Sequence, residues 1–179
     1  VGDKNEGSNS FLFPTVFLTN ANHILNKMDE LHVVTERHNA DIVCITESWL
    51  DSVTPGSLCS LSDYVVYRKD RASGQGGGVL CYVSDSIQSF EIKPVIYCPI
   101  DFDFEIIWVI IRPRILPRPL SCIVVAVVYV PPWYNVQRCK ELKSYILSCI
   151  DFFRAKYTHP GFIICGDFNT FNTDFMNSL

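Results

Sequence analysis

The segment Gly166-Asp167-Phe168-Asn169 places a carboxylate and an amide two residues apart, directly after an apolar run. The four apolar residues Phe162–Cys165, bounded by Gly on both sides, predict a short buried strand. Because strand side chains repeat with a period of two, we expect Asp167 and Asn169 to project on the same side of the strand's end. A carboxylate and an amide held together can orient a water molecule and bind an anionic oxygen. The segment therefore has the outline of a reactive site.

Three other apolar runs end on side chains that could join such a site. Asn20 follows Val-Phe-Leu-Thr, Glu47 follows Ile-Val-Cys-Ile-Thr, and Tyr129 follows the run Cys122–Val128. Strand ends gathered at one edge of a sheet commonly build a site. The alternative is that each polar group simply caps or turns the chain after its strand, which explains any one of them alone. Four polar groups with the same placement favour the site.

The chemistry of these four strand ends favours a hard metal ion. They offer oxygen atoms and amide groups, with no His or Cys among them. Such ligands suit Mg²⁺ or Mn²⁺, which bind carboxylates and phosphates, rather than Zn²⁺. The eight cysteines form no CxxC pair and no Cys/His metal spacing, and four of them lie inside apolar runs. They indicate a reducing, intracellular compartment rather than a zinc or disulfide scaffold.

Two further polar patterns are open to more than one interpretation. Asp101, Asp103 and Glu105 share a face if their segment is extended, and could form a metal cluster. Acidic residues that guard the entry to a strand are the favoured interpretation, with Glu105 near the edge of the site. The run Gly76–Gly78 lacks the Lys-Ser/Thr of a P-loop. It indicates a flexible turn that permits close backbone approach, with phosphate cradling as the minor alternative.

The elements that must position these residues are mostly strands. Two amphipathic helices, at about 22–38 and 136–157, carry apolar residues at helical spacing. Several neighbouring strands leave no room for a crossover helix, which favours a mixed, largely antiparallel sheet system of the α/β (α+β) class over a doubly wound one. The predicted strands are Thr15–Thr19, Ile42–Thr46, Tyr64–Tyr67, Val79–Val83, Phe104–Ile111, Cys122–Tyr129 and Phe162–Cys165.

The composition is that of one globular domain. The chain has 179 residues, of which 48% are hydrophobic and 19% charged. Residues 1–12 are polar at their start and predict a flexible lead-in, so the domain is assigned to 13–179. The apolar stretch Ile106–Val130 is interrupted by three Arg and three Pro, so no membrane span is predicted. No secretory signal is predicted either.

The net charge of −4 argues against bulk electrostatic binding of nucleic acid. A local basic rim can still coexist with acidic residues that hold a metal. Solvated loops are the equally simple alternative for both basic clusters. The clusters are Arg68, Lys69 and Arg71, and Arg112, Arg114 and Arg118.

Short motifs follow one another along nearly the whole chain. They are Leu18-Thr19-Asn20-Ala21, Asn26-Lys27-Met28-Asp29-Glu30-Leu31, Asp41-Ile42-Val43-Cys44-Ile45-Thr46-Glu47-Ser48-Trp49-Leu50, Tyr67-Arg68 with Asp70-Arg71, Gly76-Gly77-Gly78-Val79, Ala126-Val127-Val128-Tyr129-Val130-Pro131-Pro132 and Gly166-Asp167-Phe168-Asn169. In this order they resemble the endonuclease/exonuclease/phosphatase superfamily, which includes deoxyribonuclease I and the apurinic endonucleases. More narrowly, the chain resembles the endonuclease domain of vertebrate non-LTR (LINE-type) retrotransposons.

The resemblance implies an incomplete four-layer α/β sandwich of two mixed, mostly antiparallel sheets flanked by helices. It implies hydrolysis of DNA phosphodiester bonds with Mg²⁺ or Mn²⁺, and a nuclear role. By position, Glu47 matches the metal-binding Glu and Asn20 the Asn beside it. Tyr129 matches a Tyr that hydrogen-bonds the scissile phosphate. Asp167 matches the Asp that orients or activates the attacking water, and Asn169 the Asn that holds this water and the phosphate.

One part of the family's pattern has no counterpart in these 179 residues. The family completes its site with a later Asp and a Ser-Asp-His-type ending, whereas the four His here, at 23, 32, 38 and 159, all precede Asp167. We therefore expect this chain alone to have little or no nuclease activity and marginal stability. A phosphatase or phospholipid phosphodiesterase of the same superfamily and a non-catalytic interaction module remain alternatives. The Asn-Lys-Met-Asp-Glu-Leu and Tyr-Val-Pro-Pro segments favour the nuclease branch.

Overall fold

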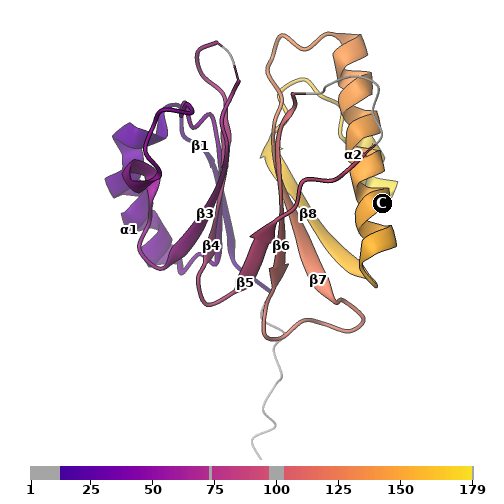
Figure 1. Cartoon of the computed structure of the whole chain (residues 1–179), viewed down its shortest axis with the longest axis horizontal. Helices are drawn as coiled ribbons and strands as arrows, with labels where there is room; N and C mark the ends of the chain where they lie inside the picture. The colour runs from indigo at the N-terminus through magenta and orange to yellow at the C-terminus, as the bar shows by residue number, and fades with distance from the viewer. Residues whose placement is uncertain (1–12, 73, 97–102, 179) are drawn as a thin grey trace, which may run out of the picture.

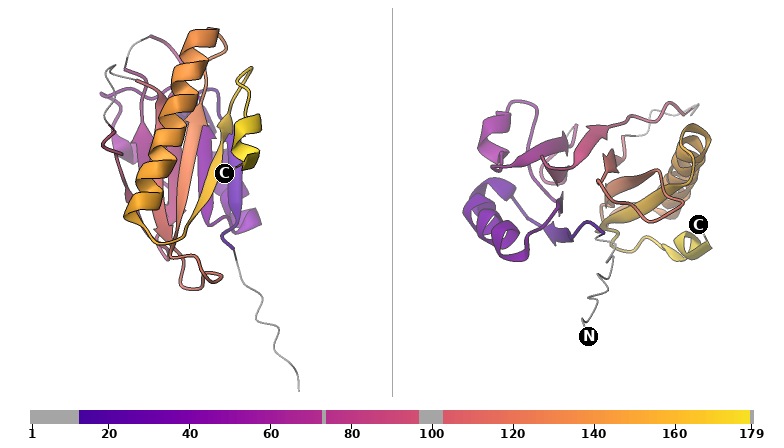
Figure 2. Two further views of the ribbon diagram at one scale, coloured as in Figure 1. Left: turned by 90° about the vertical axis from the view of Figure 1, so that its right-hand side faces the viewer. Right: turned by 90° about the horizontal axis from the view of Figure 1, so that it is seen from below.

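The computed structural model describes residues 13–72, 74–96 and 103–178. These residues form two four-stranded sheets that face each other, with a long helix on the outer side of each (Figure 1). Figure 2 shows the same four layers from two other sides. The mixed α+β sandwich expected from the sequence is thereby confirmed. The predicted lead-in at 1–12 and the acidic residue Asp101 lie outside the described residues.

The first sheet has the strand order β1-β2-β4-β3, and only its β1–β2 pair is parallel. Its strands are β1 (Val16–Asn20), β2 (Ile42–Thr46), β3 (Tyr64–Lys69) and β4 (Val79–Ser84). The second sheet has the order β5-β6-β7-β8, and only its β7–β8 pair is parallel. Its strands are β5 (Gln88–Glu91), β6 (Glu105–Arg112), β7 (Cys122–Tyr129) and β8 (Pro160–Asp167).

Each parallel pair is connected by a helix. The chain must return to the end of the sheet where the first strand begins before a second strand can run in the same direction. Helix α1 (Met28–His38) joins β1 to β2, and helix α2 (Val136–Lys156) joins β7 to β8. The two β–α–β units therefore direct the carboxyl ends of four strands toward one end of the molecule. Short 3₁₀ turns lie at Ile24–Lys27, Gly56–Cys59 and Asp174–Ser178.

The central strands are buried on both faces, which explains why they read as continuous apolar runs. Along β7, alternate residues face the opposite sheet and α2, because side chains alternate across a strand. Val125 and Val127 belong to the core between the sheets, whereas Val124 and Ala126 pack toward Ile146 of α2. The strand at Cys122–Tyr129 has the bounds that the sequence predicts.

Two local predictions are corrected by the structure. The predicted helix at about 22–38 begins as a 3₁₀ turn, and its α-helical part starts only at Met28. Asn22 and His23 have left-handed backbone conformations, and the N–H of His23 donates to the carbonyl of Glu47 at 3.1 Å, so this stretch is held to the end of β2. Strand β5 is missed by the sequence because Gln88–Glu91 is a short edge strand without an apolar run.

Within the described residues, none of the helices has the length and apolar character needed to cross a membrane.

Candidate active site

Asn20 joins the two sheets at the end where both parallel pairs terminate. Its Nδ2 lies 3.1 Å from Oε1 of Glu47 and 3.1 Å from Oδ2 of Asp167. Its Oδ1 accepts the N–H of Asn22 at 3.1 Å, which fixes the orientation of the amide. Both hydrogens of one amide therefore donate to carboxylates that come from opposite sheets.

Glu47 sits in a dense set of hydrogen-bond donors. Its Oε1 accepts the Tyr129 hydroxyl at 3.1 Å in addition to Asn20, and its Oε2 accepts the Trp49 indole N–H at 3.3 Å. Glu47 has a left-handed backbone conformation with φ 53°, which turns the chain sharply after β2. A carboxylate offers about four lone-pair positions. Three are used here, so Glu47 can bind a cation through one remaining position.

The phenol of Tyr129 stays protonated well above neutral pH. Burial, followed by the negative charge of Glu47, raises its pKa to about 12. The residue is buried, yet its hydroxyl reaches the surface site because Tyr129 is the last residue of β7. Tyr129 is also paired in register with Asp167 of the neighbouring strand. This pairing places a neutral hydrogen-bond donor beside the second carboxylate.

Asp167 and Asn169 lie together, but not for the reason that strand periodicity suggests. Strand β8 ends at Asp167, and Asn169 has a left-handed backbone conformation with φ 45°. The chain therefore folds back, and the N–H of Asn169 donates to Oδ1 of Asp167 at 3.1 Å. The Asn169 amide then donates to the carbonyl of Val130 at 2.8 Å. A side-chain-to-backbone turn, not a continued strand, brings the two side chains together.

Gly166 is required where β8 passes close to β7. It has φ 147°, and a Cβ atom at this position would overlap the carbonyl group of Val128. Only glycine combines this conformation with so close an approach. Gly166 thus sets the position of Asp167 one residue later.

The structure adds an ion pair at the edge of the site that sequence reasoning assigned no role. Glu105 is 5% exposed and accepts two bonds from Arg71, at 2.7 Å and 3.0 Å. It also accepts the backbone N–H of Gly78. A buried carboxylate needs such partners, because an unpaired buried charge is costly. The local signal was Glu105 itself, an acid at the start of an apolar strand, but nothing local identifies Arg71 as its partner.

These contacts concern the glycine run and the two members of the acidic cluster that the structure describes, Asp103 and Glu105. Glu105 forms an ion pair with Arg71, and a carboxylate oxygen of Asp103 lies 3.4 Å from Nζ of Lys69. In the part of the chain that the structure describes, no group of three or more His, Cys, Asp or Glu side chains could hold a metal ion. A Cβ atom at Gly77 would overlap Glu105 and Arg71. The predicted close backbone approach of the glycine run is therefore present.

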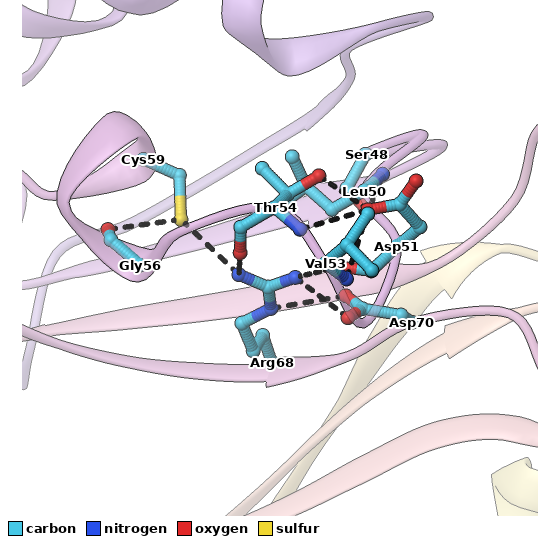
Figure 3. A network of polar contacts seen from close by, with 9 residues as sticks. All are labelled: Ser48, Leu50, Asp51, Val53, Thr54, Gly56, Cys59, Arg68 and Asp70. Carbon is cyan, nitrogen blue, oxygen red and sulfur yellow. Dashed lines mark hydrogen bonds and ion pairs between the residues drawn. The ribbon is translucent and has the colours of Figure 1, made fainter.

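The first predicted basic cluster is largely neutralised rather than a free basic rim. Arg68 pairs with Asp70 at 2.6 Å and also donates to the carbonyls of Asp51 at 2.6 Å and Thr54 at 3.0 Å (Figure 3). Asp51 in turn accepts the hydroxyl of Thr54 at 2.6 Å, which lowers the pKa of this carboxyl. The network connects the loop after Trp49 to strand β3. Arg68 therefore stabilises the loop that follows Glu47 and Trp49.

The structure places the four histidines outside the hydrogen bonds of the Asp167 and Asn169 side chains. His23 packs against the ring of Trp49 with centroids 5.8 Å apart, and His32 and His38 belong to α1. His159 precedes β8 and so lies at the opposite end of that strand from Asp167. Among the described residues, none of the side-chain hydrogen bonds to Asp167 or Asn169 comes from a histidine.

Comparison with solved structures shows that the fold is shared with a 3′ phosphatase, an AP endonuclease and a further catalytic domain. The 3′ phosphatase NExo from Neisseria bound to a product DNA hairpin superposes with a TM-score of 0.59 at 16% identity, over 88% of this chain and 58% of that one. An AP endonuclease from Leishmania major gives 0.54 at 14% identity, over 85% and 54%. The human Nocturnin catalytic domain with a bound sulfate gives 0.55 at 15% identity, over 88% and 65%.

This chain thus spans between about half and two thirds of the length of these three proteins. A comparison with curated proteins gives no match. The family model described as Endonuclease/Exonuclease/phosphatase family matches residues 17–177. That range includes all five residues of the candidate site: Asn20, Glu47, Tyr129, Asp167 and Asn169. The chain belongs to the Endonuclease/Exonuclease/phosphatase family, a family of metal-dependent nucleases and phosphatases.

Proposed function

We propose that this chain hydrolyses phosphodiester bonds in DNA with a divalent cation, as the endonuclease domain of a retrotransposon-derived protein. One observation carries the proposal. The amide of Asn20 bridges Glu47 and Asp167, which lie 120 positions apart in the chain (167 − 47) and at the ends of different sheets. Tyr129 bonds the same oxygen of Glu47. The ends of both parallel pairs thus supply polar groups to one open surface site.

Glu47 is the residue that would hold the cation. Mg²⁺ is commonly bound through one or two protein carboxylates, with water and substrate phosphate completing its octahedron. The one free position on Glu47 fits that pattern. A cation bound there would neutralise charge on the phosphoryl and leaving oxygens. The choice between Mg²⁺ and Mn²⁺ is part of the proposal.

The other residues position the substrate and the water. The Tyr129 hydroxyl is a neutral donor that can exchange its bond to Glu47 for one to a phosphate oxygen. Asp167 accepts a proton from the attacking water, and its Oδ1 and Oδ2 are held in place by Asn169 and Asn20. Asn169 is exposed, and its side-chain amide donates to the carbonyl of Val130. Donors aimed at a developing negative charge stabilise the transition state.

The choice of DNA and of the retrotransposon branch rests on several separate supports. The ordered motifs from Leu18 to Asn169 resemble LINE-type endonuclease domains. The Neisseria enzyme is bound to a DNA hairpin, and the Leishmania enzyme is an AP endonuclease. An intracellular location is proposed on the pattern of the cysteines, and a nuclear one on the resemblance alone. That these 179 residues alone have little or no nuclease activity stays a prediction.

The proposal is tested by metal binding and plasmid nicking measured on the same variants. Mn²⁺ binding is titrated by electron paramagnetic resonance for wild type, Glu47→Gln and Asp85→Asn, an exposed acidic residue beyond the opposite end of the sheet. We expect Glu47→Gln to weaken binding at least tenfold and the control to change nothing. Equal binding by all three proteins would remove Glu47 from its role.

Nicking of supercoiled plasmid is then followed with Mn²⁺, with Mg²⁺ and with EDTA. Slow nicking that requires the cation and disappears in Asp167→Asn supports hydrolysis. Nicking that persists in Asp167→Asn contradicts the assigned chemistry. A chain that binds Mn²⁺ through Glu47 but cleaves neither plasmid nor a 3′-phosphorylated oligonucleotide is a binding module. Release of inorganic phosphate without nicking would instead favour the phosphatase alternative.

A further inference from the structure

Trp133 is a large aromatic residue held at the surface beside the candidate site. It is 66% exposed and lies in the loop between β7 and α2, four positions after Tyr129. The loop around it is anchored: the N–H of Tyr134 donates to the carbonyl of Pro131 at 3.1 Å, and the Tyr134 ring packs against Phe104. A single exposed hydrophobic residue needs no explanation by itself. What matters here is the contact that orients this indole.

Arg71 holds the indole in place. Its guanidinium lies 5.1 Å from the centroid of the Trp133 ring and 5.7 Å from that of Tyr129. Arg71 is only 12% exposed, because Glu105 and the carbonyl of Gln75 bind it at 2.7 Å and 2.9 Å. The cation is thus immobile, and cation–π attraction orients the Trp133 ring. A preorganised ring loses less conformational freedom when it binds a ligand.

The same chain of contacts continues into the site. Tyr129 has Arg71 over its ring and its hydroxyl 3.1 Å from Glu47. Trp133, Arg71, Tyr129 and Glu47 therefore form an unbroken series from an exposed aromatic surface to a candidate metal ligand. Arg71 thereby links the exposed indole of Trp133 to Tyr129, whose hydroxyl reaches Glu47.

The chemistry of this surface selects a flat, uncharged ligand. The charge of Arg71 is compensated by Glu105, and Arg68 and Lys69 are paired with Asp70 and Asp103. With a net charge of −4, the chain offers little bulk attraction for phosphates. Aromatic stacking can supply affinity in its place, since every nucleobase has a π-face. A base inside a duplex is already stacked, so only an unpaired or flipped base can reach the indole.

We propose that Trp133, oriented by Arg71, is a stacking platform for an unpaired nucleobase next to the scissile phosphate. This rests on the proposed function, since the platform selects the substrate of that same site. Its substrates are strands with a single-stranded or distorted segment at the cleavage position. Recognition of this kind depends little on the base sequence of the strand, because all four bases can stack.

Binding in EDTA tests the platform without any hydrolysis. A fluorescein-labelled single-stranded 12-mer is titrated by anisotropy with wild type, Trp133→Ala, Trp133→Phe and Ile115→Ala. Ile115 is a matched control that is 60% exposed in the loop between β6 and β7, at the far end of the sheet. We expect Trp133→Ala to weaken binding about 5- to 100-fold, Trp133→Phe to weaken it less, and Ile115→Ala to change it less than twofold.

An abasic strand of the same length separates stacking from charge. Wild type should bind it about as weakly as Trp133→Ala binds the normal strand, and the affinity should depend only shallowly on salt. Equal affinity of wild type and Trp133→Ala for the normal strand would overturn the platform. So would equal binding of normal and abasic strands by wild type. Self-association that depends on Trp133 but not on nucleic acid would assign this surface to a protein interface and likewise overturn it.

The outcomes also separate this proposal from the proposed function. If binding depends on Trp133 but the chain never cleaves DNA, the stacking platform is supported and the proposed hydrolysis is contradicted. If cleavage of both single-stranded and duplex substrates requires Asp167 but does not depend on Trp133, the proposed hydrolysis is supported and the stacking platform is contradicted.

Discussion

The two parallel β–α–β units each end in a carboxylate, but they hold it differently. In the first unit, Glu47 accepts three side-chain donors, from Asn20, Trp49 and Tyr129. In the second unit, Asp167 accepts one side-chain donor from Asn20 and one backbone N–H. Equivalent topology therefore yields one tightly fixed carboxylate and one with fewer partners. This difference suits a fixed metal ligand and a group that exchanges a proton with water.

The largest expected effect distinguishes the two carboxylates by rescue. Asp167→Asn should lower the rate of plasmid nicking by about 10²- to 10⁴-fold, because a general base is lost, and extra Mn²⁺ should not restore it. Glu47→Gln should lower the rate at low Mn²⁺ but recover as the ion concentration rises. The measurement is the nicking rate as a function of Mn²⁺ concentration. Rescue of both variants, or of neither, would show that the two carboxylates have the same role.

The next effect concerns the strand that carries Asp167. Gly166→Ala should destabilise the fold by about 3 kcal/mol, since its Cβ would overlap the carbonyl of Val128 at a strained φ. Gly56→Ala is the control, because a Cβ there meets no atom within 4 Å. Urea unfolding followed by circular dichroism measures both variants. Similar midpoints for Gly166→Ala and wild type would show that β8 can shift freely, and Asp167 with it.

The hydroxyl of Tyr129, which links the two units, should lose its proton only at high pH. Subtracting the ultraviolet titration of Tyr129→Phe from that of wild type should isolate a phenol with a pKa of about 12. Because the folded pKa lies above the unfolded value of 10, its contribution to stability is complete below pH 10 and is lost as pH rises toward 12. Nicking should fall about tenfold in Tyr129→Phe. A difference titration centred on pH 10 would show that neither burial nor the charge of Glu47 acts on the Tyr129 phenol.

The smallest effect compares the two helices. The Asn135 side chain accepts the N–H of Arg138 at 2.8 Å and caps α2, whereas the residue before α1, Lys27, makes no side-chain cap bond. Asn135→Ala should destabilise the chain by about 1 kcal/mol. Glu36→Ala, which removes an exposed pair with His32 in α1, should cost less than about 0.5 kcal/mol. Thermal unfolding ranks the two, and the reverse order would show that α1 depends more on its surface contacts.

Much of the fold could be predicted because burial leaves a direct trace in the residue pattern. Strands β2 and β7 occur with their predicted bounds, since both are apolar on both faces. Strand β5 was missed because an edge strand needs no apolar run. The helix that was expected from about residue 22 starts later, because hydrogen bonds to the end of β2 override local helix preference between Asn22 and Lys27.

The site was predictable in its members but less so in its geometry. The polar residues Asn20, Glu47, Tyr129 and Asp167 were visible because each ends an apolar run. Their roles remain predictions. The position of Asn169 was expected from strand periodicity, yet a turn after β8 produces it. The pairing of Arg71 with Glu105 joins residues 34 positions apart, and no local pattern predicts it.

The buried segments and the polar residues at their ends can be read from the residue pattern, because alternation and apolar runs are local properties. Tertiary structure decided what those groups do to one another. Only the packing of the two sheets brings Asn20 between Glu47 and Asp167, and only the contact of the β3–β4 loop with the second half of the chain brings Arg71 to Glu105, Tyr129 and Trp133. Hydrogen bonds and charge pairs act over a few ångströms, so distance along the chain does not set their strength.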